Sequence, residues 1–262
     1  MRKIKIYGFI PARMDSSRFY GKPLHPIAGL PMIGHVIERA RLYKDWAGLF
    51  LTTCDEEIKD YGESLNIPVI MTSSKHTRAL DRIAEAVNLS GKNINNDDII
   101  LNVQGDEPMF QPGMIDATIK PMLDDNGVKG TILAMEIINE EQFNDPNALK
   151  IVYNLKGDIL YTTRSPVPYC KKFNPEIGAK RIYGIFGFRW QYLKMFTELT
   201  ETRLELLESC DSNRFYDNGF TQRMAPYPYV ESFSVDVPED VEKVEKYILD
   251  DHYYLLYKDN IN

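Results

Sequence analysis

Residues 4–24 read IKIYGFIPARMDSSRFYGKPL, a short apolar run followed by a basic loop. The run Ile4–Ile10 is rich in β-branched and aromatic residues, which predicts a buried first strand that stops at Pro11. The loop after it carries three cations, Arg13, Arg18 and Lys22. Cations among small residues with open backbone N–H groups favour a polyphosphate ligand. On the cations alone, a solvated basic loop is the alternative interpretation.

The composition is that of an ordinary globular protein. The chain has 262 residues, of which 44% are hydrophobic and 26% charged, enough for one α/β domain with a large core. The net charge of −7 means that the surface as a whole repels nucleic acid and anionic membranes. A polyanion must therefore bind at a local basic site.

The three cysteines, Cys54, Cys170 and Cys210, show neither a pairing pattern nor the spacing of metal ligands, which is typical of a reducing compartment. The start of the chain lacks the apolar stretch of a signal peptide. No run approaches the roughly 18 to 20 apolar residues of a membrane span. We therefore predict a cytoplasmic protein.

Strand and helix patterns alternate over the first half of the chain. Apolar runs predict further strands at 47–53, 68–72 and 98–104, and helical spacing predicts helices at 31–42, 58–65 and 78–89. This alternation predicts an α/β fold with a doubly wound, mostly parallel sheet. Ligands bind beyond the carboxyl ends of the strands in such sheets, where both the basic loop and the turn Gly105–Pro108 are placed.

Residues 130–165 differ in pattern, because three strands follow one another with short turns, at 130–137, 148–153 and 158–163. They predict a small antiparallel extension, a lid or dimerisation subdomain, within a single domain spanning residues 1–262. A strand at 183–189, a largely helical stretch at 191–207 and one amphipathic helix at 238–256 complete the prediction.

Two acidic turns are candidates for chemistry. Asp106 follows a buried strand and a glycine, although a turn aspartate before Pro108 is common by itself. Asp236 lies in VDVPED at 235–240, where it could simply cap a helix.

The basic loop and the two acidic turns follow one another in the order known from one family of enzymes. The basic loop, the string NVQGDEP at 102–108 and VDVPED at 235–240 resemble the motifs of the sugar-acid cytidylyltransferases. The resemblance is strongest to enzymes that make the CMP ester of 3-deoxy-manno-octulosonate (Kdo), with acylneuraminate cytidylyltransferases as cousins. The loop is not a Walker motif, because Lys22 is followed by Pro and Leu.

The resemblance implies a Rossmann-like nucleotidyltransferase fold and a reaction. CMP passes from CTP to the hydroxyl of an acidic sugar, with Mg²⁺ as cofactor, and pyrophosphate leaves. The implied pathway is synthesis of a surface polysaccharide, lipopolysaccharide or capsule. The implied partners are CTP, a small acidic sugar and a second copy of the chain, with no nucleic acid.

The resemblance also assigns roles residue by residue. Catalysis is assigned to Arg13, Lys22 and Asp106. Nucleotide binding is assigned to Pro11, Ala12, Arg13, Ser16, Arg18, Lys22, Arg82 and Gln104. Asp106 and Asp236 are assigned to one Mg²⁺, which prefers a few hard oxygen ligands completed by water and phosphate. Acceptor binding is assigned to Gln104, Lys150, Arg164 and Glu208. For Arg82, an exposed helical arginine paired with Asp81 or Glu85 is the alternative.

Three segments depart from the Kdo pattern. HTRALDR at 76–82 lacks a Ser-Gly-Thr core, RIYGIFGFR at 181–189 lacks an imidazole and two phenol hydroxyls, and ELLESCD at 205–211 loses a glutamine and reverses the last charge. Each unpaired sugar hydroxyl costs roughly 1 to 3 kcal/mol. The departures favour a Kdo variant or another ulosonic acid over Kdo itself.

Other functions remain open at this point. A sugar-phosphate nucleotidylyltransferase usually has a Gly-x-Gly-Thr-Arg type of loop, which the basic loop does not match. A glycosyltransferase usually has an Asp-x-Asp motif, which the Asp106-Glu107-Pro108 turn does not match. A non-catalytic nucleotide-binding homologue agrees with the altered acceptor segments. The joint presence of Arg13, Lys22, Asp106 and Asp236 favours an enzyme.

Overall fold

Residues 2–260 are described by a computed structural model, and they separate into two compact units. Unit 1 consists of the residues up to Ile115 and those from Glu231 onward, and unit 2 is Asp116–Val230. The antiparallel strands predicted between residues 130 and 165 all belong to unit 2. The single-domain organisation stays a prediction.

Unit 1 is built on four parallel strands in the order β6-β1-β4-β5. They are β1 Ile6–Pro11, β4 Gly48–Thr53, β5 Val69–Met71 and β6 Ile99–Val103. Phe9 in the centre of β1 lies opposite Phe50 of β4 and Asn102 of β6. The chain moves outward from β1 to β5 and then returns to the other side of β1. The doubly wound parallel topology is therefore confirmed.

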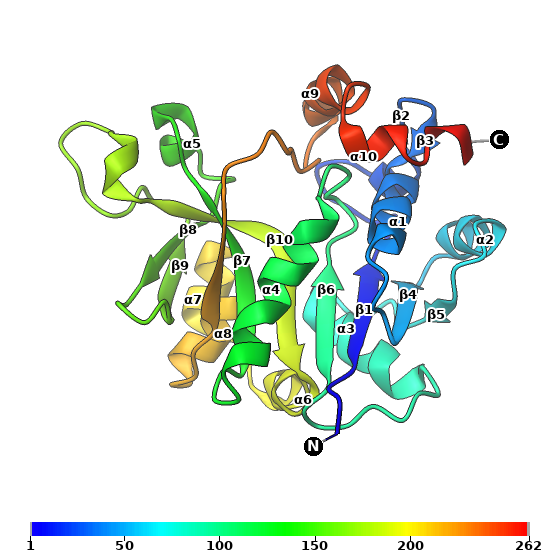
Figure 1. Ribbon diagram of the computed structural model, residues 1–262, viewed down its shortest axis with the longest axis horizontal. Helices are drawn as coiled ribbons and strands as arrows, with labels where there is room; N and C mark the ends of the chain where they lie inside the picture. Colours follow the sequence, from blue (N-terminus) through cyan, green and yellow to red (C-terminus); the bar gives the residue numbers. More distant parts are fainter. Residues whose placement is uncertain (1, 261–262) are drawn as a thin grey trace. The chain divides into compact units, whose positions relative to one another are not determined.

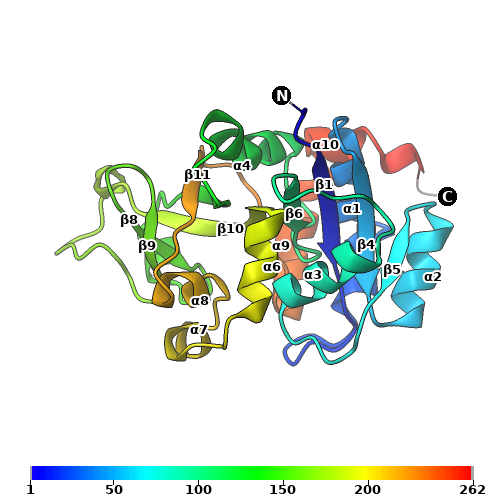
Figure 2. The same cartoon turned by 90° about the horizontal axis from the view of Figure 1, so that it is seen from below.

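Three helices connect these strands, namely α1 Met32–Leu42, α2 Glu56–Ser64 and α3 Ala79–Leu89. Figures 1 and 2 show α1 and α3 on opposite faces of this sheet. The loops after β1 and β6 therefore leave the sheet at the point where the winding direction reverses, and ligands of doubly wound sheets bind at such a point.

A second core of unit 1 is formed where the C-terminal helices pack on a hairpin from the N-terminal part of the chain. It contains the hairpin of β2 Pro26–Ile27 and β3 Leu30–Pro31, the helices α9 Pro238–Ile248 and α10 His252–Leu255, and the short 3-10 helix η3 Lys258–Asn260. The prediction of one helix over 238–256 is wrong. Asp251 interrupts it, because its side chain accepts a hydrogen bond from the Tyr254 N–H at 3.0 Å and so caps a new helix.

Unit 2 contains five strands. β10 Lys180–Arg189 runs antiparallel to β7 Gly130–Glu136, and β11 Arg223–Tyr227 runs parallel to β7. β8 Lys150–Tyr153 and β9 Ile159–Thr163 form an antiparallel pair that joins β10 where Lys150 meets Arg181. The predicted antiparallel pairing is confirmed for β8 and β9, whereas β7 pairs with β10 and β11 and is separated from β8 by the helix α5. A role as a lid or dimer surface stays a prediction.

The helical stretch predicted at 191–207 is two helices, α6 Trp190–Glu198 and α7 Arg203–Glu208. They are separate because Thr202 and Glu205 form a capping box that starts α7. The sequence patterns also missed three strands, β2, β3 and β11, and three α-helices, α4 Pro112–Asp124, α5 Glu140–Asn144 and α8 Ser212–Asp217.

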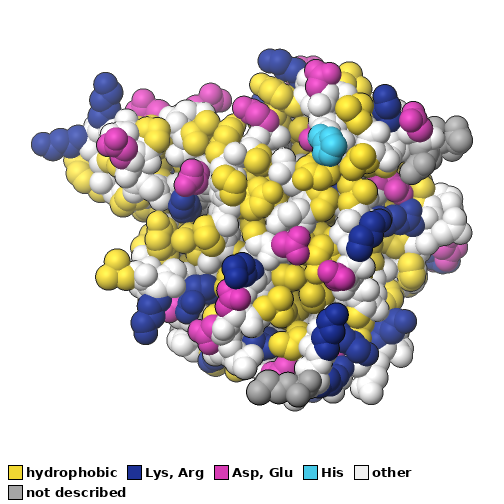
Figure 3. All heavy atoms as spheres, in the orientation of Figure 1, with side chains coloured by type: hydrophobic (Ala, Val, Ile, Leu, Met, Phe, Trp, Pro, Cys, Tyr) yellow, Lys and Arg dark blue, Asp and Glu magenta, His cyan; other side chains and the backbone are white. Residues whose placement is uncertain are grey.

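The surface carries charges of both signs. On the face in Figure 3, basic and acidic side chains of the described residues are interspersed. None of the helices within residues 2–260 has the length and hydropathy needed to span a bilayer. Cys54, Cys170 and Cys210 are free thiols.

Candidate active site

Two backbone N–H groups of the basic loop after β1 donate hydrogen bonds that hold its shape, one to a side chain and one to a carbonyl. The Met14 N–H donates to Asp55 Oδ2 at 2.8 Å, and the Gly21 N–H donates to the Met14 carbonyl at 2.9 Å. Gly21 has a φ of 74°, a left-handed conformation that favours glycine. The short 3-10 helix η1 Lys22–Leu24 starts directly after it. These bonds and the turn at Gly21 therefore fix the position of the Lys22 backbone.

The turn after β6 packs against the start of this loop. A Cβ on Gly105 would lie 2.6 Å from the Pro11 carbonyl oxygen, so only glycine permits this approach. The Asp106 carbonyl accepts a hydrogen bond from the Val235 N–H at 2.9 Å. This bond brings the segment with Asp236 beside the turn with Asp106.

The three motifs meet at the ammonium group of Lys22. Lys22 Nζ lies 2.8 Å from Asp106 Oδ2 and 3.7 Å from Asp236 Oδ1, and it donates to the Val235 carbonyl at 2.8 Å. Arg18 Nη2 contacts Asp236 Oδ1 at 2.8 Å. Burial lowers the pKa of Lys22, but the attraction of Asp106 and Asp236 outweighs it, so the pKa lies above its ordinary value. Lys22 is therefore a permanent cation between two carboxylates.

The donor set around Lys22 fits magnesium. No group of three or more His, Cys, Asp or Glu side chains suited to a metal occurs within residues 2–260. Two carboxylates nevertheless suffice for Mg²⁺, which keeps several waters and takes substrate phosphate oxygens as further ligands. The side chains of Asp106 and Asp236 are 27% and 32% exposed, so an ion can reach them.

Arg13 and Arg82 both hold the loop after β5. Arg82 Nη1 donates to Thr72 Oγ1 at 2.6 Å, and its Nη2 donates to the His76 carbonyl at 3.3 Å. Arg13 Nη1 donates to the same carbonyl at 3.4 Å. The interpretation of Arg82 as an exposed arginine is wrong, because only 3% of it is accessible and it faces inward from α3.

Glu85 accepts hydrogen bonds from groups other than Arg82, although, against the opposing effect of burial, the charge of Arg82 contributes to lowering the Glu85 pKa. Its Oε2 accepts from the Ser73 N–H at 2.9 Å and contacts His76 Nε2 at 2.5 Å. His76 itself lies in the loop between β5 and α3. The remaining nucleotide candidates are also in unit 1: Pro11 ends β1, Ala12 is buried, Ser16 lies half-buried in the loop, and Gln104 follows β6 directly.

Three of the four acceptor candidates meet in unit 2. Glu208 Oε2 accepts from the Arg164 N–H at 2.8 Å, and Arg164 Nε donates to the Glu208 carbonyl at 2.9 Å. Lys150 is fully buried, and its ammonium donates to the carbonyls of Arg164, at 3.2 Å, and Asp145. Burial lowers the pKa of Lys150. The fourth candidate, Gln104, belongs to unit 1.

Two members of this cluster were missed from sequence. The hydroxyls of Tyr161 and Thr163 donate to Glu208 Oε1 at 2.6 and 2.8 Å. Burial, and then the charge of Glu208, raises the pKa of Tyr161 to about 12, so this phenol stays a donor. The two residues are two positions apart in β9, so their side chains lie on the same face of the strand. This spacing is the sequence signal that could have predicted a common partner for both.

The departures from the Kdo pattern lie in different environments. Phe188 is 1% exposed, and its ring stacks on Phe215 with centroids 5.5 Å apart. A missing phenol hydroxyl at this position therefore removes no accessible polar group. Leu80 is likewise in the core, on α3, whereas Ile182 is half-buried on β10.

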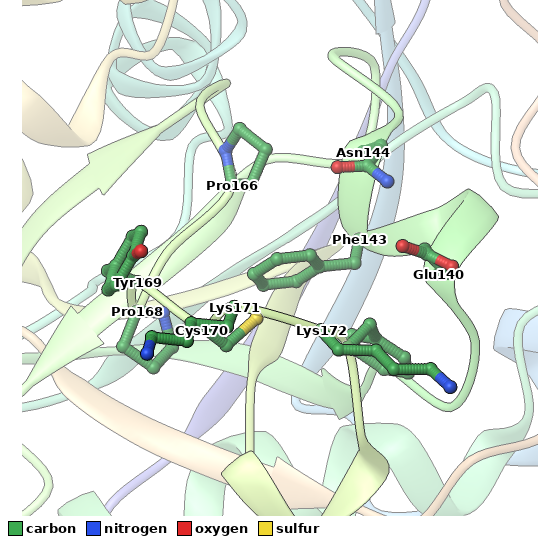
Figure 4. Close-up of a pocket in the computed structure, with 10 residues that line it drawn as sticks. Glu140, Phe143, Asn144, Pro166, Pro168, Tyr169, Cys170, Lys171 and Lys172 are labelled. Atoms are coloured by element: carbon green, nitrogen blue, oxygen red, sulfur yellow. The ribbon is translucent and has the colours of Figure 1, made fainter.

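A separate pocket of about 160 Å³ lies in unit 2 between α5 and residues 166–173. Figure 4 shows the Phe143 ring among the side chains of this segment. None of the predicted site residues lines it.

The fold and the clustered charges define a class of protein, an α/β nucleotide-binding enzyme with a cationic loop and a paired-carboxylate site. A model of the family described as cytidylyltransferase matches residues 7–232. The 3-deoxy-manno-octulosonate cytidylyltransferase of Thermodesulfovibrio yellowstonii is 40% identical over 245 residues, which cover 90% of this chain and 95% of that protein. The chain belongs to the cytidylyltransferase family, and it is an enzyme of that kind.

Two further relatives extend this result. The 8-amino-3,8-dideoxy-manno-octulosonate cytidylyltransferase of Shewanella frigidimarina is 36% identical, covering 92% of this chain and 98% of that protein. A solved structure of CMP:2-keto-3-deoxy-manno-octonic acid synthetase complexed with CTP matches with a TM-score of 0.84 at 32% identity, over 94% of this chain and 98% of that one. The resemblance inferred from the motifs is confirmed.

Proposed function

We propose that this enzyme transfers CMP from CTP to a hydroxyl of an acidic sugar of the Kdo type, with Mg²⁺ and release of pyrophosphate. The observation that carries the proposal is the ammonium of Lys22 between Asp106 and Asp236, at 2.8 and 3.7 Å. Such a site already balances one cation against two carboxylates. A triphosphate with its metal can enter by exchanging partners within this set.

The reaction requires charge neutralisation more than covalent catalysis. The sugar oxygen attacks the α-phosphorus, a new P–O bond forms, and the bond to the pyrophosphate oxygen breaks. Asp106 and Asp236 would hold Mg²⁺, which when bound neutralises phosphate oxygens and orients the nucleotide. Because charge spreads over the phosphate oxygens, preorganised cations supply most of the stabilisation.

The cations of the loop have different parts in this scheme. Lys22 also donates to the Val235 carbonyl, so it has a partner that holds it in place if Asp106 and Asp236 bind a metal ion instead. From this position it can donate to a phosphate oxygen. The side chain of Arg18 is 51% exposed, and in this scheme it exchanges its contact with Asp236 for the outer phosphates. Arg13, with its planar fork, suits a phosphate beside the loop after β5.

The acceptor is proposed as Kdo or a close variant. The names of the relatives support this class, because one specifies an 8-amino sugar and another Kdo itself. In unit 2, Arg164 is the natural candidate for the sugar carboxylate, because a guanidinium binds carboxylates in a bidentate manner. A role in surface polysaccharide synthesis and a homodimer belong to the same proposal and rest on the motif resemblance. A cytoplasmic location belongs to it as well and rests on the cysteine pattern.

The test is pyrophosphate release from CTP and Mg²⁺ across a panel of Kdo, 8-amino-Kdo, N-acetylneuraminate and sugar 1-phosphates. We expect release with the first two acids and none from Asp106→Ala. Tight CTP binding without release from any acceptor would support the non-catalytic homologue instead. Turnover with sugar 1-phosphates alone would support the sugar-phosphate nucleotidylyltransferase, and equal use of ATP or GTP would refute the cytidylyl assignment.

A further inference from the structure

Arg39 is a buried cation that the proposed reaction does not use. It lies on α1 and has no accessible surface. Its Nη1 donates to the carbonyls of Met109 and Phe110 at 3.3 and 3.1 Å. Its Nη2 contacts Asp251 Oδ1 at 2.5 Å. A buried guanidinium is costly unless all of its donors are paired, so this arrangement demands several partners at once.

The Nε donor of Arg39 enters a defined chain of hydrogen bonds. Arg39 Nε donates to the Tyr257 hydroxyl at 3.2 Å, and that hydroxyl lies 2.8 Å from His35 Nδ1. Burial lowers the pKa of His35 to about 4, so its ring is neutral. Because His35 Nε2 lies 2.7 Å from the Ile27 carbonyl, the proton sits on Nε2, and Nδ1 accepts from the Tyr257 hydroxyl. Each donor in this chain then faces an acceptor: Arg39 donates to Tyr257, Tyr257 to His35, and His35 to the Ile27 carbonyl.

One end of the network fixes the Asp106 turn. Met109 and Phe110 follow Asp106 by three and four residues, and both are buried. The Phe110 N–H donates to the Glu107 carbonyl at 3.3 Å, which continues the turn back toward Asp106. Arg39 therefore holds the C-terminal end of the turn, while the bond from Val235 to the Asp106 carbonyl holds its middle.

The other end fixes the segment that follows Lys22. Ile27, whose carbonyl faces His35, lies on β2, directly after the η1 segment that contains Lys22. The Tyr254 hydroxyl donates to the Ala28 carbonyl at 3.1 Å, so α10 is hydrogen-bonded to the hairpin that contains Ile27. Figure 1 shows α10 beside α1 and next to the β2–β3 hairpin. One apolar cluster unites these parts: Ile27, Leu30, Met32, Met109, Val235, Val241, Val244, Ile248, Tyr254 and Tyr257.

We propose that Arg39, with Asp251 and Tyr257, is the positioning centre that sets the distance between Lys22 and Asp106, an inference that rests on the proposed function. Asp251 and Tyr257 lie beyond residue 232, where the match to the family model ends. Asp251 and Tyr257 thus help to build a site although neither contacts Lys22, Asp106 or Asp236 in the bonds described above.

The test compares two buried arginines. Arg39→Lys keeps a cation for Asp251 but loses the fork that binds two carbonyls. Arg189→Lys is the matched control, because Arg189 is 2% exposed and donates to the Val128 and Met122 carbonyls at 3.0 and 2.7 Å. Both variants should lose stability. The readouts are turnover per folded molecule, the KM for CTP, and amide hydrogen exchange of the peptide covering residues 104–110.

For Arg39→Lys we expect turnover per folded molecule to fall about 10- to 100-fold, as a misplaced reactive group does. The KM for CTP should change by less than about threefold, because the loss lies in the transition state. Exchange in 104–110 should rise, whereas Arg189→Lys should change neither turnover nor this exchange. Equal turnover per folded molecule in both variants, or unchanged exchange in 104–110, would overturn the proposal.

Tyr257→Phe covers the case in which Arg39→Lys does not fold. It removes one hydroxyl and leaves the guanidinium, so faster exchange in 104–110 supports the proposal and unchanged exchange refutes it. The exchange readout needs no substrate. An unmodified chain that turns over no acceptor would refute the proposed function, while the exchange data would still decide this inference.

Discussion

Lys22 in unit 1 is half-buried and Lys150 in unit 2 is fully buried, and the two ammonium groups have different kinds of partner. Lys22 stands between two carboxylates, and its pKa is raised despite burial. Lys150 donates to backbone carbonyls, and burial lowers its pKa. A cation held by carboxylates can exchange them for phosphate and metal, whereas a cation bonded to carbonyls ties two chain segments together. The surroundings of Lys22 therefore suit an exchange of ligands, and those of Lys150 suit rigidity.

Lys22→Met should have the largest effect. It removes the charge with little change in volume, and we expect turnover to fall about 10²- to 10³-fold, as for loss of a preorganised donor. Mg²⁺ should bind the nucleotide-free variant more tightly, because no ammonium competes for Asp106 and Asp236. Isothermal titration with Mg²⁺ and a pyrophosphate assay measure the two effects.

Lys150→Met is the paired variant, and it separates the two environments. It leaves the Asp145 and Arg164 carbonyls without their donor, so stability should fall while the CTP affinity stays unchanged. A large loss of CTP affinity in this variant would contradict the division of roles between the two lysines.

The scaffold of unit 1 should be sensitive to acid through His35. The folded protein keeps this imidazole neutral down to a pKa of about 4, whereas the unfolded chain takes up a proton near its ordinary pKa of 6.5. Between these values the unfolded state binds more protons, so the free energy of unfolding falls as the pH falls. A shift of this size corresponds to about 3 kcal/mol at most.

The two tryptophans allow this effect to be assigned to a unit, because Trp46 lies in unit 1 and Trp190 in unit 2. Denaturant unfolding of Trp190→Phe, followed by fluorescence from pH 7 to 4, reports on unit 1. His35→Gln is the control, since an amide can accept from Tyr257 and donate to Ile27 without titrating. An identical pH dependence in this variant would show that His35 is not the cause.

Glu208→Gln tests the acceptor cluster. The carboxylate accepts from the Arg164 N–H, Tyr161 and Thr163, and an amide nitrogen in place of one oxygen would face a donor. We expect a loss of about 1 to 3 kcal/mol in stability. The KM for the sugar should rise by about tenfold while the KM for CTP is unchanged, if this cluster binds the acceptor. Steady-state kinetics with each substrate varied in turn provides the measurement, and an equal change in both KM values would contradict the assignment.

Much of the fold could be predicted from local patterns, because strand alternation in β1, β4 and β6 and helical spacing in α1 and α3 depend on neighbouring residues. The split helices also have local causes, the caps at Thr202 and Asp251, that the apolar periodicity concealed. Within the site, the motifs indicated that Lys22, Asp106 and Asp236 belong together.

Long-range burial could not be predicted in this way. Arg82 and Lys150 look like surface cations in the sequence, and their partners are carbonyls and a hydroxyl that tertiary folding brings to them. Arg39 lies within an ordinary helical pattern, and its partners are 70 to 218 residues away in the chain. A backbone carbonyl leaves no signature in the sequence, so these contacts became visible only in three dimensions.

Arg18→Ala should have the smallest effect and is the sharpest test of exchange in unit 1. Arg18 Nη2 contacts Asp236 at 2.8 Å, but its side chain is 51% exposed, and such surface ion pairs contribute about 0 to 1 kcal/mol. Its removal frees Asp236, so the Mg²⁺ concentration for half-maximal activity should fall. Loss of a phosphate ligand should at the same time raise the KM for CTP, by less than about tenfold. These opposite shifts are what an arginine that alternates between a carboxylate and a phosphate produces. A rise in both the KM for CTP and the Mg²⁺ concentration for half-maximal activity would contradict this exchange. It would mean that Arg18 stays beside Asp236 and supports the metal site while Mg²⁺ is bound.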